Sequence, residues 1–183
     1  MPKTRSEDLR SDHGEWAGER WGASGRPVLL LNPAEDDRSA WWPVAARLVD
    51  LGAVSVLDLP EGRTVADQAE SLALLAARAG ARAPVLAGHG RAALVATVFA
   101  VRYVAHAVVN VGQRLDVPEA AEAGGRLECR YLSVFSAEPR PGYEAWLRVR
   151  VPGGEYEEYG TGDAHPHLGS PGRFAADLRR VAC

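Results

Sequence analysis

One stretch decides the fold of this chain, residues 84–95, which read PVLAGHGRAALV. The apolar run Val85–Ala87 predicts a short buried strand, and Gly88 and Gly90 after it permit a tight turn. The turn leads into an Ala- and Val-rich segment, Arg91–Arg102, which predicts a helix. A strand that passes through a tight turn into a helix is typical of an α/β protein with a parallel sheet.

The same alternation of strand and helix continues on both sides of this stretch. Continuous aliphatic runs predict strands that are buried on both faces, as in a parallel sheet. Further predicted strands are Pro27–Leu31, Ala53–Leu59, Ala107–Val111, Tyr131–Phe135 and Glu155–Tyr159, and further predicted helices are Ala40–Leu51, Thr64–Arg78, Tyr143–Val149 and Pro171–Val181. We therefore expect an α/β fold consisting of a single domain with a mostly parallel, doubly wound sheet.

The remaining segments are expected to be peripheral to this sheet. Residues 1–14 are polar and predict a disordered N-terminal tail, so that the domain spans residues 15–183. Glu15–Gly22 predicts a weak edge strand or hairpin whose tryptophans cover a sheet edge. The polar connection at residues 112–128 is short and holds one predicted helical turn, Pro118–Ala123.

Composition narrows the class of protein. The 183 residues carry a net charge of -3, which argues against non-specific nucleic-acid binding. No apolar run approaches the roughly 18 residues of a membrane span. Cys129 and Cys183 are not spaced as C-x-x-C, so we expect a reduced, cytoplasmic protein with no disulfide framework. Lys3 is the only lysine beside abundant Arg, Ala and Gly, which we interpret as a GC-rich, bacterial coding sequence.

The turn at residues 88–92 has the setting of a nucleophile elbow. In the motif G-x-S-x-G, the nucleophilic serine lies on a sharp turn between a strand and the head of a helix. Here the frame is Gly88-x-Gly90-x-Ala92, so the outer small residues are kept and glycine stands at the nucleophile position. Glycine has no side-chain oxygen that could attack an acyl carbon.

Three further segments, in the same order along the chain, extend this likeness. Pro27–Asn32 with the following Trp41-Trp42-Pro43 resembles a strand, oxyanion loop and first helix, and VLDLP at 56–60 resembles a D-x-P-G turn. HPHLGSPGRF at 165–174 resembles a tail of the form PHLE-x-P-E-x-F. Over about residues 20–182 the chain resembles the α/β-hydrolase superfamily. The 19 residues at 112–130 are too few for the helical cap that many members carry, so we expect a minimal member with an open pocket.

The resemblance implies positions for a catalytic triad. The nucleophile position is Gly90, and the acid position is Glu138, whose alternative interpretation is a solvated turn carboxylate. The histidine of the superfamily falls on Ala164, next to His165. Either a local shift brings His165 into the role of base, or the base is lost and His165 and His167 are surface residues; the ungapped alignment of "PHL" favours the second.

The resemblance also implies an altered oxyanion loop. Asn32-Pro33 stands where the superfamily has H-G, and proline has no backbone N–H to donate. The remaining donors would be the side-chain amide of Asn32, the N–H groups of Ala34 and Glu35, and the N–H of Arg91 after the elbow. Removing a triad serine costs on the order of a millionfold in turnover, so a serine-dependent hydrolase is excluded for this chain.

Two functions from different classes remain. The first is a catalytically impaired pseudo-hydrolase that acts as a binding or partner protein, with His89 and Arg91 flanking a helix N-terminus where a small acyl or anionic molecule docks. In the alternative interpretation of this turn, the glycines only permit a tight backbone. The second is a nucleophile-independent enzyme in which His165 is the general base toward a small carbonyl or ester compound, oriented by Glu138 or Asp163 and supported by Asn32. A protein partner or homo-oligomer stays open.

Other candidate residues carry no predicted chemistry. His106 is expected to be a packing histidine, and His13 falls in the tail. Cys129 precedes a buried strand with no adjacent base, so it is not predicted as a nucleophile. His165 and His167 lack a third ligand at suitable spacing, so we predict no metal site and no cofactor.

Overall fold

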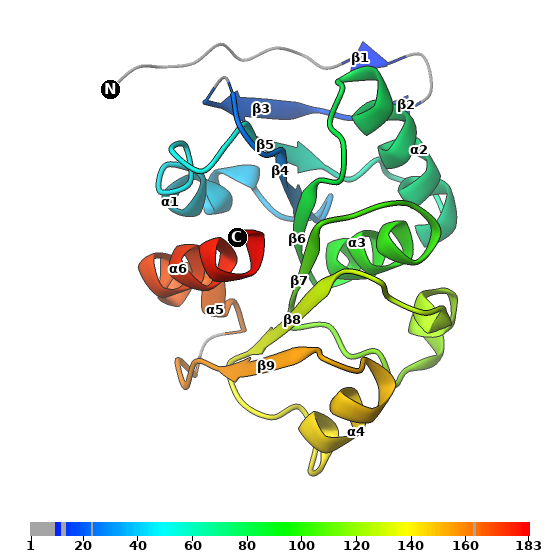
Figure 1. Ribbon diagram of the computed structural model, residues 1–183, viewed down its shortest axis with the longest axis vertical. Coiled ribbons are helices and arrows are strands. Elements are labelled where there is room, and N and C mark those ends of the chain that lie inside the picture. The colour runs from blue at the N-terminus through cyan, green and yellow to red at the C-terminus, as the bar shows by residue number, and fades with distance from the viewer. Residues whose placement is uncertain (1–9, 12–13, 23, 163) are drawn as a thin grey trace.

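A mostly parallel sheet forms the centre of the computed structural model, which describes residues 10–11, 14–22, 24–162 and 164–183 (Figure 1). Within these residues the main sheet has seven strands in the order β3-β5-β4-β6-β7-β8-β9. Their bounds are β3 Gly18–Trp21, β4 Val28–Asn32, β5 Val54–Asp58, β6 Val85–His89, β7 Ala107–Val111, β8 Arg130–Phe135 and β9 Glu155–Glu158. Edge strand β3 pairs antiparallel with β5, and all other pairs are parallel, which confirms the predicted fold class.

Helices cover both faces of this sheet (Figure 1). The long helices α2 (Val65–Arg78) and α3 (Arg91–Arg102) pack on one face, as does α4 (Tyr143–Arg150). The other face is covered by the short α1 (Trp42–Ala45) and the C-terminal α6 (Pro171–Ala182), which follows the one-turn α5 (Pro166–Gly169). None of the helices in the described ranges is long and apolar enough to cross a lipid bilayer.

The central strands are buried on both sides because two separate cores sandwich them. Leu29 and Leu31 of β4 face the core beneath α2 and α3, whereas Val28 and Leu30 face the core beneath α1 and α6. Every residue of β4 is buried. This two-sided burial explains why the strand sequences are continuous aliphatic runs with no polar alternation.

The predicted element boundaries agree closely with the structure except near α1. Helix α3 has the predicted bounds, and the connection at residues 112–128 holds the 3-10 helix η2 (Pro118–Gly124). The Thr64 hydroxyl caps α2 as predicted, because it accepts a hydrogen bond from the Asp67 N–H at 3.1 Å. The predicted helix Ala40–Leu51 is wrong in length. A 3-10 helix, η1 (Arg38–Trp41), passes into the four-residue α1, and residues 46–51 form turns.

A close backbone contact accounts for this shortened helix. Residues 46–51 continue in turns, with Leu48 N–H bonded to the Ala45 carbonyl and Leu51 N–H bonded to the Leu48 carbonyl, until Gly52 reaches the backbone of Arg26. A side chain at Gly52 would overlap the Arg26 carbonyl, so only glycine permits this approach. The chain is thereby drawn toward the start of β4 before a long helix can form.

The structure tests the predicted edge strand near the N-terminus but only a few residues of the predicted disordered tail. Gly18–Trp21 forms the predicted edge strand β3, and a two-stranded hairpin, β1 (Arg10–Ser11) with β2 (Gly14–Glu15), precedes it. The predicted disorder of residues 1–14 falls largely on residues 1–9 and 12–13, which lie outside the described residues, as does His13.

Candidate functional site

The turn at residues 88–92, which the resemblance interprets as a nucleophile elbow, is well defined in its backbone. Gly90 has φ 53° and ψ −127°, a conformation that side-chain-bearing residues rarely adopt. Its N–H donates to the Val111 carbonyl at 3.0 Å, and its carbonyl accepts from the Ala93 N–H at 2.9 Å, so the turn is bonded on both sides. A Cβ atom built at Gly90 would have no other heavy atom within 4 Å. The elbow therefore keeps its shape, and open space takes the place of the missing side chain.

Gly88 is needed for a different reason. A Cβ atom at Gly88 would lie 2.5 Å from the carbonyl carbon of Ala92 and 2.7 Å from the Ala93 nitrogen. Helix α3 thus passes so close to the end of β6 that only glycine fits. The spacing of the two glycines reflects two constraints, a close backbone approach at Gly88 and a left-handed φ at Gly90.

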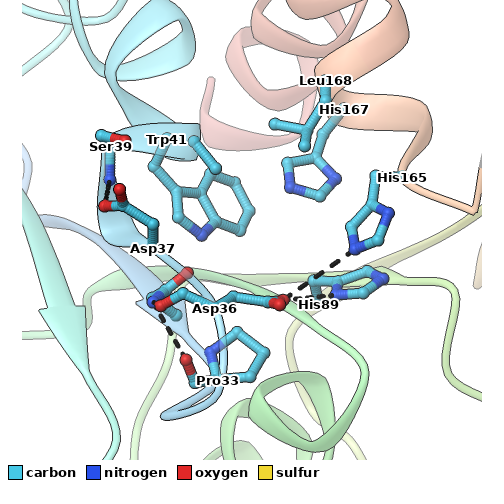
Figure 2. A pocket seen from close by; sticks show the side chains of 11 residues that line it. Pro33, Asp36, Asp37, Ser39, Trp41, His89, His165, His167 and Leu168 are labelled. Atoms are coloured by element: carbon cyan, nitrogen blue, oxygen red, sulfur yellow. Dashed lines mark hydrogen bonds and ion pairs between the residues drawn. The ribbon is translucent and has the colours of Figure 1, made fainter.

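A cavity of about 340 Å³ lies beside the elbow, at the carboxyl ends of β4 and β6 (Figure 2). Ligands of open α/β sheets bind at this end of the strands. The walls come from the loop after β4, η1, the end of β6 and α5. The lining residues are Asn32, Pro33, Asp36, Asp37, Ser39, Ala40, Trp41, His89, His165, His167 and Leu168.

Three imidazoles and one carboxylate meet in this cavity. His89 Nδ1 lies 3.8 Å and His165 Nε2 lies 3.9 Å from the same Asp36 oxygen, Oδ2 (Figure 2). The rings of His89 and His165 have centroids 4.3 Å apart, and the His167 ring is 5.4 Å from that of His89. The residue before the glycine of the elbow thus contacts the C-terminal histidine segment directly.

His167 is a buried histidine, so the interpretation of His165 and His167 as surface residues is wrong for this position. Its side chain is 2% exposed and stacks on Trp41 at a centroid distance of 4.4 Å, with Phe174 at 5.8 Å. Burial, and secondarily the neighbouring His89 and His165, lower the pKa of His167 to about 3. The ring is therefore neutral near pH 7 and forms part of the core under α6.

His89 is also held toward its neutral form. Burial is the largest cause of its lowered pKa, and the nearby His165 lowers it further, while Asp36 acts in the opposite direction. Its ring hydrogen-bonds the backbone of Ala164, the residue at the histidine position of the superfamily. His165 itself is one-third exposed and lies in the cavity wall, and its role as a base stays a prediction.

Asn32 positions the loop after β4. Its side-chain nitrogen contacts three acceptors, the Pro33 carbonyl at 3.0 Å, the Asp36 carbonyl at 2.7 Å and the Asp58 carboxylate at 3.0 Å. The side chain is buried, and its two amide hydrogens are directed at these protein acceptors. The amide that sequence reasoning assigned to a bound carbonyl thus contacts protein acceptors in this structure, and its role toward a ligand stays a prediction.

Three predicted residues lie outside the cavity wall. The Arg91 guanidinium donates to the Arg63 carbonyl at 2.7 Å, on the exposed side of α3. Glu138 is exposed, and its carboxylate accepts from the Glu144 N–H at 3.2 Å at the start of α4. Ala34 is exposed and does not line the cavity. The carboxylate that faces His165 is Asp36, which sequence reasoning did not propose.

Asp36 and His167 could have been found from weaker signals. Asp36 follows the carboxyl end of a predicted strand by five residues, the place where loops of a parallel sheet converge. His167 follows a proline and precedes Leu168 in an apolar segment, which is compatible with burial. Cys129 behaves as expected, since burial raises the pKa of its thiol and disfavours the reactive thiolate.

Comparison with known proteins shows which fold this is. No protein-family model and no curated protein sequence matches the chain. Among solved structures, AqdC with its product, from work on ring cleavage of the Pseudomonas quinolone signal, has a TM-score of 0.80 at 13% identity and covers 94% of this chain and 98% of its own.

Two further structures have similar values. A thermophilic esterase from Thermogutta terrifontis has a TM-score of 0.72 at 18% identity and covers 92% of this chain and 94% of its own. Est816, an N-acyl homoserine lactone degrading enzyme, has a TM-score of 0.74 at 12% identity, with coverages of 93% and 98%. The neighbours are α/β-hydrolase enzymes, so the chain has the α/β-hydrolase fold. At these identities the likeness establishes the fold alone.

Proposed function

We propose that this α/β-hydrolase-fold protein is a pseudo-hydrolase that binds a small acyl molecule and performs no serine-type acyl transfer. The observation that carries the proposal is Gly90, which keeps the elbow backbone and leaves open space where a nucleophile would project. Serine-type chemistry needs an oxygen at this position and a base that takes its proton. A turn with glycine at this position supplies no such oxygen, so it cannot form an acyl-enzyme.

No other lining side chain replaces the missing nucleophile. Ser39 supplies the hydroxyl among the lining residues that the structure describes, and its backbone N–H donates to the Asp37 carboxylate at 2.9 Å. Figure 2 shows Ser39 beside Asp37, with Trp41 between it and the imidazoles, so no imidazole is placed to activate its hydroxyl. The cavity therefore offers imidazole and carboxylate groups without an activated oxygen nucleophile.

The charges of the cavity favour a neutral ligand over an anion. Asp36 and Asp37 line it, and the guanidinium of Arg91, predicted as an anion contact, is bonded elsewhere. Burial keeps His89 and His167 toward their neutral forms, so neither supplies a fixed positive charge. A small ester, lactone or ketone could accept hydrogen bonds at the start of α3 and pack on Trp41 without bringing a charge of its own.

Ligand-observed NMR with ethyl butyrate and butyrate tests this proposal. The neutral ester is expected to show saturation transfer from the protein, and the carboxylate is expected to show little. Ala40→Phe places a ring in the cavity and should abolish the signal, while Val149→Phe, on the exposed surface of α4, should leave it unchanged. Absence of a signal for every neutral acyl compound tested, or equal signals in both variants, would overturn the proposal.

A second candidate is a nucleophile-independent enzyme, favoured by the position of His165 against Asp36 and His89. An imidazole near a carboxylate can remove a proton from carbon next to a carbonyl. AqdC, a structural neighbour that cleaves the ring of the Pseudomonas quinolone signal, supports by analogy alone that this fold can carry reactions other than ester hydrolysis. Exchange of α-protons of a small ketone for deuterium, followed by NMR, should then be catalysed by the native chain and lost in His165→Ala. Equal exchange in the two proteins would exclude it.

A further inference from the structure

Asp36, His89 and His165 form a cluster of one carboxylate and two imidazoles, which are groups that an acyl-binding pocket does not require. The three residues come from the loop after β4, the end of β6 and the segment before α5. One atom of each, a carboxylate oxygen or an imidazole nitrogen, lies within 4.8 Å of the other two. Figure 2 shows both imidazoles directed toward the same Asp36 carboxylate.

We propose that Asp36, His89 and His165 form a binding site for one divalent transition-metal ion such as Zn²⁺ or Co²⁺. Two imidazole nitrogens and one carboxylate oxygen are the three-ligand set that such ions take while keeping a position open for water or a ligand. Mg²⁺ and Ca²⁺ prefer all-oxygen sites, so they fit this set poorly. Sequence reasoning weighed His165 with His167 as ligands; the two groups that join His165 in this site, Asp36 and His89, come from distant segments.

The surroundings of His89 leave one of its ring nitrogens free to bind a metal ion. Its buried Nδ1 atom has no hydrogen-bond partner among the described residues, although it points toward the cavity. The ring is bonded to the backbone of Ala164, and since Nδ1 has no partner, this bond uses Nε2. A metal-ligating histidine usually donates its second N–H in this way to a backbone carbonyl, which leaves the other nitrogen as the ligand. An unpartnered buried nitrogen is otherwise unfavourable.

Asp36 is also held from outside the cluster. The amide of Asn32 donates to the Asp36 backbone carbonyl at 2.7 Å and to Asp58 at 3.0 Å, which fixes the loop that carries the carboxylate. The loop thus lies beside the end of β6, where His89 is located. Supporting contacts of this kind set the position of metal ligands and contribute to affinity.

The three groups have to move closer together to bind one ion. Bonds of about 2.0–2.1 Å at tetrahedral angles place neighbouring ligand atoms about 3.3 Å apart. The present separations of 3.8 and 3.9 Å from Asp36 Oδ2 exceed this by about half an ångström, and the two imidazole nitrogens lie within 4.8 Å of each other. The side chains of Asp36 and His165 are each about one-third exposed and can rotate, and the cavity gives an ion access from water. His167, stacked on Trp41, remains outside the set.

Metal binding is measured on untagged protein carrying Cys183→Ser, which removes the exposed thiol, after treatment with EDTA and dialysis. Equilibrium dialysis with Zn²⁺ is expected to give one ion per chain, and Co²⁺ is expected to give visible absorption bands of a low-coordinate site. Asp36→Asn, His89→Gln and His165→Gln should each weaken Zn²⁺ binding at least about tenfold. Asp37→Asn, in the same cavity wall, and His106→Gln are the matched controls and should leave binding unchanged.

The outcomes separate this proposal from the proposed function. Loss of stoichiometric Zn²⁺ binding in the three variants alone, with circular dichroism showing that each is folded, supports the site. No stoichiometric binding by the native chain, or equal binding in the three variants and the two controls, overturns it. The two proposals can fail independently. Zn²⁺ binding is measured without any acyl compound, and the NMR test with ethyl butyrate is made in the presence of EDTA, which removes the metal.

Discussion

The elbow and the histidine cluster lie side by side at the end of β6, but the chain builds them in different ways. The elbow is made of consecutive residues and is held by its own backbone, with bonds from Gly90 to Val111 and Ala93. The cluster is made of side chains from three segments, Asp36, His89 and His165, which meet only in the folded sheet. A local backbone feature can persist without its chemistry, whereas a side-chain cluster exists only through tertiary contacts.

Under the proposed function, this difference explains how the turn can keep its shape with glycine at position 90. The left-handed φ of Gly90 strains any side-chain-bearing residue, so glycine relieves the elbow of a conformational cost. The histidine segment has no comparable local constraint, and its His165 and His167 line the cavity. Under the proposed function the turn keeps its backbone shape alone, and the cluster is where chemistry remains available.

The largest expected effect separates the two glycines of the elbow. Gly88→Ala forces a Cβ atom into the backbone of Ala92 and should lower the free energy of unfolding by about 3 kcal/mol or more. Gly90→Ala meets open space and suffers only from its φ, which costs about 1–3 kcal/mol. Urea denaturation measures both values. A Gly88→Ala variant that is no less stable than Gly90→Ala would contradict the close approach of α3 to β6.

The next effect concerns the loop that carries Asp36. Asn32→Ala leaves buried acceptors without a donor and should cost about 2–3 kcal/mol in urea denaturation. Asn32→Asp keeps the shape but places a second carboxylate against Asp58, so it should be destabilising at pH 7 and partly recover at pH 4 as carboxylates are protonated. Full stability of both variants at pH 7 would show that the amide does not hold the loop.

The histidine cluster predicts an acid sensitivity of stability. The pKa of His167 falls from about 6.5 in the unfolded chain to about 3 in the folded one, because burial disfavours its charge. Below pH 6.5 the unfolded state therefore binds a proton that the folded state does not, and stability falls as pH falls. One such group costs about 2 kcal/mol at pH 5 relative to pH 7.5.

Thermal or urea unfolding of the native chain and of His167→Phe, with EDTA present, measures how much His167 contributes to the loss of stability at low pH. The variant should lose less stability than the native chain between pH 7.5 and pH 5, by the same 2 kcal/mol or so. Its stability at pH 7.5 serves as the internal control for packing on Trp41. Identical pH dependence in the two proteins would mean that His167 is not buried in its neutral form.

The smallest effect is expected at Arg91. Its exposed guanidinium donates to the Arg63 carbonyl at 2.7 Å, so Arg91→Ala should change stability by less than about 0.5 kcal/mol. Ethyl butyrate binding should also be unchanged, as judged by saturation transfer. A marked loss of binding in this variant would return Arg91 to the ligand site that the sequence predicted.

The fold could be predicted from the sequence because its signals are local. The glycines at 88 and 90, the Thr64 cap and the aliphatic strands each specify their own conformation. The helix predicted at Ala40–Leu51 failed where the local signal was overridden by the contact of Gly52 with Arg26. That contact joins residues that touch in the fold but are 26 positions apart in the sequence.

The candidate site could be predicted only in part for the same reason. Gly90, His89 and His165 are on or beside motifs, and the structure brings the two histidines together. The sequence next to a side chain does not say which distant groups it will contact. Sequence reasoning therefore does not propose Asp36 and places the acid at Glu138. It also assigns Asn32 to a ligand, although the amide of Asn32 donates to the Asp36 carbonyl. The burial of His167 depends on Trp41 and Phe174, which lie in other helices.

The central claim is that the elbow persists without an acyl-transfer nucleophile, and hydrolysis of p-nitrophenyl butyrate by the native chain tests it most directly. Rapid-mixing measurements should show no burst of p-nitrophenol and no turnover above that of the Ala40→Phe variant, whose cavity is filled. A burst close to one equivalent per chain, followed by turnover that Ala40→Phe abolishes, would contradict the account, because it would require a covalent acyl-enzyme that Gly90 cannot form.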